Sequence, residues 1–296
     1  MGIVLGPNQY GKSENRVVRI YRDTSRHEIR ELNVSTSLRG DFDAAHTIGD
    51  QSAVLPTDTQ KNTFFSFAKE QGITSIEEYA RALGEHFVDG TGAVSAARVE
   101  VEEYAWQRIE VDGAGHDHAF TRAGSETRST VVTVDDTGSD RRTTVVSGLK
   151  DLVLAKTTGS EFHGFLKDRY TTLPETHDRI LATSLVARWR YNRTDVDWDT
   201  TYQSVRGLLL QKFAEVHSYA LQQSLYAMGE AALEKHPEIV QIRFAAPNKH
   251  HFLVDLGPFG VDNPGEVFVA ADRPYGLIEA AVQRDDAPAE AEEWHW

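Results

Sequence analysis

Residues 6–13, GPNQYGKS, place Lys12 between a glycine and a serine, at the spacing of a phosphate-binding loop in nucleotide hydrolases. Such a loop needs a helix directly after it, because the helix N-terminus and the loop amides together hold the phosphates. The residues that follow, ENRVVRIYRD, have the pattern of a β-strand, and the sequence lacks alternating strand–helix units. We therefore expect Lys12 to act on something other than a nucleotide.

A second group of polar residues lies in APNKHHFLVDL, residues 246–256. Successive residues of a strand point to opposite faces, so Asn248 and His250 share one face. These two side chains could line a polar pocket, although an ordinary polar start of a strand has the same spacing.

Thr57 and Gln60 form a capping-box pattern, which predicts that Thr57 is the N-cap of a helix. The amides of the first turn, that of Asp58 among them, would then favour an anion. His116 and His118 could face a metal ion from one strand. An exposed turn explains these histidines better, because no carboxylate–histidine motif accompanies them.

Three further residues have both a structural and a functional interpretation. Arg179 stands after ETHD and could hold an anion or form an exposed ion pair. Phe162 could stack on a ligand or pack in the core, and Gln222 could bind a ligand or be a solvated helix residue. The spacing of these residues does not choose between the interpretations.

The predicted strands and helices that position these residues occur in the same order in both halves of the chain. Residues 17–21 and 32–38 predict strands, helices follow from about residues 57 and 76, and two strands form a long hairpin around DGAGHDH. In the second half, TTVVSGLKDLVLAKT and RILATSLVARWRYNR predict strands, followed by a helical stretch over 200–236 that breaks near 217 or 218. EIVQIRFAA and HHFLVDL predict the two final strands.

This repeat predicts an α+β fold with antiparallel sheets, built from two similar ββααββ modules. We expect the first module over residues 1–138, the second over 139–282, and an acidic C-terminal tail over 283–296. The tail is expected to be loose or to act as a docking segment.

Composition narrows the possible partners. The chain has 31 basic and 45 acidic residues, a net charge of −14, which disfavours nucleic acid. It has no cysteine, which excludes disulfides, thiolate nucleophiles and cysteine-ligated zinc. No run of about 18 apolar residues and no signal-peptide pattern is present, so we expect no membrane partner and a cytoplasmic protein.

Several motifs together resemble those of the urate oxidase (uricase) family. They are YGK near the N-terminus, PTDTQKNT, FHGFLKDRYTTLPETHDRIL, LQQSLY and PNKHHF, and they occur in the family order. The resemblance implies the tunnelling fold, with two modules per subunit and a homotetramer around a central β-barrel channel. It also implies active sites at subunit interfaces, with Thr57 and Asp58 supplied by the neighbouring chain.

The family oxidises urate with O₂ and water to 5-hydroxyisourate and H₂O₂, without a metal or an organic cofactor. The resemblance therefore implies a cofactor-independent oxidoreductase of purine degradation. A non-catalytic purine or pterin binder on the same fold is the alternative. The chain ends in WHW and lacks the peroxisomal signal of eukaryotic relatives, which favours a bacterial, cytoplasmic protein.

The resemblance also implies roles for the purine-binding residues. Arg179 and Gln222 would clamp the purine edge, because a planar guanidinium suits two acceptors in one plane. Phe162 would stack on the ring, and the backbone of Leu221 and the amide of Asp58 would contact the substrate.

The same resemblance implies that Lys12 and Thr57 form a proton relay, with the Thr57 hydroxyl on another subunit. His250 would extend this relay, through Thr57 or Lys12, and Asn248 with Thr57 would hold O₂ and then the attacking water. His163 and His177 depart from the family pattern, since tryptophan occurs there in some relatives.

Overall fold

The computed structural model describes residues 2–289 and divides into two compact units. The first unit comprises Met1–Gly148 and Arg190–Thr200, and the second comprises Leu149–Trp189 and Thr201–Trp296. These units do not coincide with the expected modules, whose boundaries stay a prediction. No helix of the described residues is long and apolar enough to cross a membrane.

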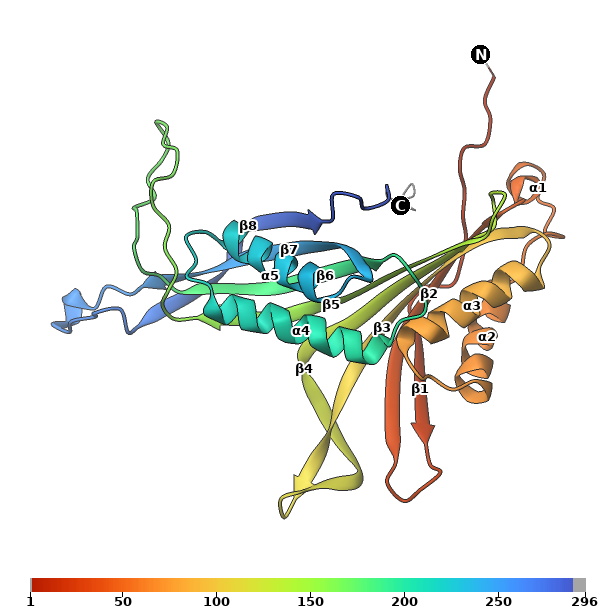
Figure 1. Ribbon diagram of the computed structural model, residues 1–296, viewed down its shortest axis with the longest axis horizontal. Helices are drawn as coiled ribbons and strands as arrows, with labels where there is room; N and C mark the ends of the chain where they lie inside the picture. The colour runs from red at the N-terminus through yellow and green to blue at the C-terminus, as the bar shows by residue number, and fades with distance from the viewer. Residues whose placement is uncertain (1, 290–296) are drawn as a thin grey trace. The chain divides into compact units, whose positions relative to one another are not determined.

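The first unit is an antiparallel sheet with helices packed on it (Figure 1). Its elements are β1 (Asn15–Tyr21), β2 (Glu28–Gly40), α1 (Asp43–Thr47), α2 (Thr57–Glu70), α3 (Ile76–Gly90), β3 (Val94–Val111) and β4 (Ala114–Asp135). The strands pair in sequence order from β1 to β4. Asp112 and Gly113 have positive φ angles between β3 and β4, which is the Asp-Gly geometry of a tight hairpin. The predicted hairpin is confirmed.

The second unit has the corresponding arrangement of strands and helices. Its elements are β5 (Arg142–Lys156), which begins in the first unit, β6 (Leu181–Tyr191), α4 (Trp198–Glu215), α5 (Leu221–Lys235), β7 (Ile239–Leu253), the 3₁₀ turn η1 (Gly257–Phe259) and β8 (Phe268–Gln283). Apart from the short α1 and η1, the order of elements in both halves is the predicted one. The break in the long helical stretch falls at residues 216–220, as expected.

The prediction of the last two strands is wrong. EIVQIRFAA and HHFLVDL both belong to β7, and the final strand is β8, whose sequence FVAADRPYGLIEAAVQ was not recognised as a strand. Pro247, between the two predicted segments, lies within β7 opposite Leu277 of β8. The pairing becomes irregular between Asn248 and His250, so the strand continues through a bulge.

One helix in each unit packs a glycine closely against its sheet. A Cβ on Gly84 of α3 would lie 2.9 Å from Cγ2 of Val134 in β4. A Cβ on Gly229 of α5 would lie 2.6 Å from Cγ2 of Val282 in β8. The absent side chain lets each helix approach the sheet, so these glycines are packing residues rather than weak points of their helices.

Candidate functional site

Lys12 lies on a short segment that runs along β2 in the first unit. Tyr10 exchanges two backbone hydrogen bonds with Leu38, and the carbonyl of Lys12 accepts one from the amide of Thr36, at 2.8 Å. Between them, a Cβ on Gly11 would lie 1.8 Å from the carbonyl oxygen of Thr36. Only glycine permits this approach, which explains the glycine of the YGK motif.

A chain of hydrogen bonds connects Lys12 to the start of α2. The amide of Lys12 donates to the hydroxyl of Thr36 at 3.3 Å, and that hydroxyl donates to the side-chain carbonyl of Gln60 at 2.7 Å. Gln60 is fully buried. The ammonium groups of Lys61 and, more weakly, Lys12 lower the pKa of Asp58.

Lys12 therefore lies near the first turn of α2 of its own chain. This differs from the expectation that Lys12 meets Thr57 across a subunit interface. Thr36 of β2 forms hydrogen bonds with both Lys12 and Gln60, so these two residues belong to one folding unit. If a neighbouring subunit supplies Thr57 to a site, the same subunit supplies Lys12.

The predicted capping role of Thr57 is wrong. Pro56 is the N-cap of α2, and Thr57 is the first residue of the helix. Thr57 is exposed, and within residues 2–289 its hydroxyl has no hydrogen-bond partner. The carboxylate of Asp58 binds Lys61 and the amide nitrogen of Asn62 on the surface of α2. Since the first amides of a helix have no intrahelical acceptor, those of Thr57 and Asp58 remain open to a ligand.

Phe162 and Arg179 lie together in the second unit. Their segments pair through two backbone hydrogen bonds between Phe162 and Thr176, and the amide of Arg179 donates to the carbonyl of Ser160 at 2.9 Å. The guanidinium carbon of Arg179 lies 5.1 Å from the centre of the Phe162 ring. Desolvation by burial lowers the pKa of Arg179. The ring of Phe165 stacks on that of Phe162 with centres 4.9 Å apart, so Phe162 already accepts a planar partner on one face.

Hydrogen bonds of buried serines connect the start of α5 to the segments that carry Phe162 and Arg179. Ser160 and Ser218 form a bridge between two segments, and the amide of Glu161 donates to the carbonyl of Ser218 at 2.8 Å. The hydroxyl of Ser224 in α5 donates to that of Ser218 at 2.9 Å. Three serines of this network, Ser160, Ser218 and Ser224, are fully buried. The spacing of these serines gave no signal of the network.

The network positions the first two residues of α5 beside Phe162 and Arg179. Leu221 is buried and Gln222 is exposed, and the N-cap side chain makes no capping hydrogen bond. The amide of Gln223 donates to the carbonyl of Ala220 at 3.1 Å, whereas the amides of Leu221 and Gln222, as the first two of the helix, have no intrahelical acceptor.

Asn248 and His250 both lie on β7 and are half-buried. The ring of His250 stacks on that of Phe252 with centres 5.8 Å apart. Between Asn248 and His250 the pairing partner on β8 changes from Gly276 to Ala271, so the extra residues of the irregularity lie on β8 and the shared face of Asn248 and His250 stays a prediction. Within the described chain, no hydrogen bond or ring contact joins either residue to Phe162, Arg179 or the start of α5.

The structure reveals a cluster of charged side chains that the sequence did not predict. The carboxylate of Glu161 meets the rings of His163, His177 and His217. The hydrogen bond from His217, followed by those from the other two histidines, lowers the pKa of Glu161. The spacing of Glu161 and His163 was the only signal in the sequence, since the remaining partners are distant along the chain.

His116 and His118 belong to β4, directly after the turn of its hairpin, with ring centres 4.5 Å apart. Asp117 between them binds Arg26 at 3.1 Å. The histidines thus decorate the exposed end of a hairpin, in agreement with the structural interpretation.

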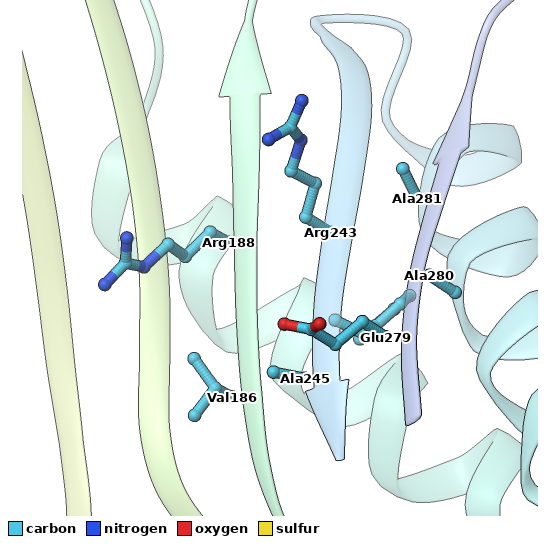
Figure 2. A pocket seen from close by; sticks show the side chains of 8 residues that line it. Val186, Arg188, Arg243, Ala245, Glu279, Ala280 and Ala281 are labelled. Atoms are coloured by element: carbon cyan, nitrogen blue, oxygen red, sulfur yellow. The ribbon is translucent and has the colours of Figure 1, made fainter. Parts of the chain in front are cut away.

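A hollow lies on the sheet of the second unit, apart from all predicted site residues. Figure 2 shows that its side chains extend from β6, β7 and β8 on the face turned away from the helices. The charged members are Arg188, Arg243 and Glu279, and alanine and valine side chains form the remainder of the visible wall. The hollow is open, and among its lining residues only Glu279 carries a group suited to acid–base chemistry.

Comparisons with known proteins identify the family of this chain. The uricase family model matches residues 8–133 and 145–279. The chain is 55% identical to a uricase from Arthrobacter globiformis, over 99% of this chain and 94% of the relative, and 38% identical to a uricase from Oryctolagus cuniculus, over 93% of each. The crystal structure of the Arthrobacter globiformis uricase superposes with a TM-score of 0.93 and covers 99% of both chains. The chain therefore belongs to the uricase family.

Proposed function

We propose that this protein is a cofactor-independent urate oxidase, which converts urate, O₂ and water to 5-hydroxyisourate and H₂O₂. The observation that carries the proposal is the close approach of Arg179 to the ring of Phe162, beside the open start of α5. A flat ring, a cation and free backbone donors are the groups that a planar anionic purine requires.

Urate binding uses the second unit. The ring of Phe162 stacks on the purine, while the guanidinium of Arg179 and the side chain of Gln222 bind its polar edge. The backbone of Leu221 adds a contact from the first turn of α5. Arg179 supplies the local positive charge that an anionic substrate needs in a chain with a net charge of −14.

Proton transfer begins at Lys12 and Thr57 of the first unit. Lys12 and Thr57 remove a proton from urate, which makes the ring electron-rich enough to reduce O₂. The amide of Asp58 binds the substrate at the start of α2. His250 extends the proton relay, and Asn248 with Thr57 holds O₂ and then the water that adds to the ring. Two electrons leave the purine, O₂ leaves as H₂O₂, and the oxygen of water enters the product.

The active protein is proposed to be a homotetramer of tunnelling-fold subunits with sites at their interfaces. The proposal is supported by the separation of roles, since Lys12 and Thr57 of the relay belong to the first unit and Phe162, Arg179 and Gln222 of the purine clamp belong to the second. It is also supported by the sheet face around Arg188 and Arg243, which no helix of the second unit covers and which could line the channel.

The proposal is tested by following urate absorbance and dissolved oxygen together, with purified protein that has been treated with a chelator. We expect urate and dissolved oxygen to be lost at equal rates. The alternative, a purine or pterin binder without catalysis, predicts ligand binding with no oxygen consumption. That outcome would exclude an oxidase.

A further inference from the structure

The Glu161 carboxylate lies where three segments of the second unit meet. Residues 160–162 pair with residues 176–179 on one side and with Ser218 on the other. Each segment contributes a histidine to the carboxylate, namely His163, His177 and His217. The side chain of Glu161 is 15% exposed, whereas that of His177 is 74% exposed, so the cluster has a half-buried end at Glu161 and an open side at His177.

The spacing of the ligand atoms fits a metal ion. Oε2 of Glu161 lies 2.9 Å from Nε2 of His163 and 3.4 Å from Nδ1 of His177, and all three potential ligand atoms lie within 4.8 Å of one another. Zinc bonds of about 2.0–2.1 Å in a tetrahedral site separate neighbouring ligands by about 3.4 Å. Only a small movement of the exposed His177 ring is needed to reach this spacing.

We propose that Glu161, His163 and His177 form an accessory site for a divalent transition-metal ion of the zinc class. Two imidazoles and one carboxylate are a ligand set that Zn²⁺ and Co²⁺ accept, with the open side left to water. His217 donates to the other carboxylate oxygen, Oε1, at 2.6 Å and so orients Glu161 toward the ion.

The site is separate from the proposed oxidation chemistry. In an extended segment, Glu161 and His163 point to the opposite side from Phe162. A metal ion would tie the segment of Phe162 to the segment of Arg179. The inference thus goes beyond the proposed urate oxidation, and a metal-binding measurement tests it whether or not the protein oxidises urate.

The test is a titration of tag-free, chelator-treated, full-length protein with ZnCl₂ and with CoCl₂. We expect saturable binding of one ion per chain, visible absorption from bound Co²⁺, and a rise in the thermal unfolding temperature with Zn²⁺. Glu161→Gln and His177→Gln should each weaken binding by more than about tenfold, and His217→Gln by about tenfold. His177→Gln changes an exposed side chain, so a folding defect cannot hide the effect.

His118→Gln is the matched control, because His118 also lies close to a second histidine but outside this cluster. Binding to this variant should equal that of the unchanged protein. Absence of saturable binding, or binding that survives both Glu161→Gln and His177→Gln, would overturn the proposal.

Discussion

Lys12 and Thr57 carry the proton transfer in this account. Lys12→Met removes the base and Thr57→Ala removes the exposed hydroxyl, so each should lower kcat by about 10²-fold or more, as loss of general-base catalysis does. Steady-state urate oxidation measures the effect. Lys69→Met and Thr59→Ala, on the same helix, are controls that should keep full activity. Full activity in Lys12→Met would remove this residue from the relay.

Gly11 positions Lys12 through its close approach to Thr36. Gly11→Ala would place a methyl group 1.8 Å from the Thr36 carbonyl and push the segment away from β2. We expect a loss of about 1–3 kcal/mol in unfolding free energy, typical of overpacking, together with reduced turnover. Gly6→Ala meets no atom within 4 Å and should leave both quantities unchanged. Equal behaviour of the two variants in denaturant titrations and assays would contradict this explanation.

At the residue scale, the motifs identified the candidates but not their partners. The short pattern at residues 6–13 matched a phosphate loop because it contains Gly11, whose real role is packing against Thr36. The cluster around Glu161 could not be predicted, because His177 and His217 reach it through backbone pairing between distant segments. The capping pattern was also misleading, since Pro56 rather than Thr57 is the N-cap of α2.

At the element scale, Gly229 allows α5 to pack on its sheet. Gly229→Ala should lower the unfolding free energy by about 1–3 kcal/mol, because its Cβ would overlap Val282. Gly207→Ala, in the exposed part of α4, meets no atom within 4 Å and should raise it by roughly 0.5–1 kcal/mol through helix propensity. Thermal and denaturant unfolding measure the change in unfolding free energy of each variant. A stabilising Gly229→Ala would show that the helix can move away from the sheet without cost.

The order of elements was largely predictable because hydrophobic periodicity follows local geometry. The helix expected from about residue 76 illustrates this, since α3 begins at Ile76 and the hydroxyl of Ser75 accepts a 3.1 Å hydrogen bond from the amide of Glu78. Strand β8 was missed because Pro274 and Gly276 interrupt its pattern. The pairing of β8 with β7 stabilises it as a strand, and a non-local contact of this kind leaves little trace in the sequence.

At the scale of the whole molecule, the proposed interface sites allow a complementation test. Lys12→Met affects the first unit and Arg179→Gln the second, so each variant alone should be nearly inactive. If sites combine these units from two subunits, random mixed tetramers should regain about one quarter of the active sites. Activity assays of co-expressed and separately expressed variants measure the recovery. No recovery in mixed tetramers would indicate that each site is built within one chain.

The central claim is that this chain oxidises urate with its own residues. The most direct measurement is the stoichiometry of urate lost, O₂ consumed and H₂O₂ formed by chelator-treated, metal-free protein. The account predicts equal amounts of all three, at a rate unchanged by the chelator. Purine binding without oxygen consumption, or oxidation that stops when metal is removed, would contradict it.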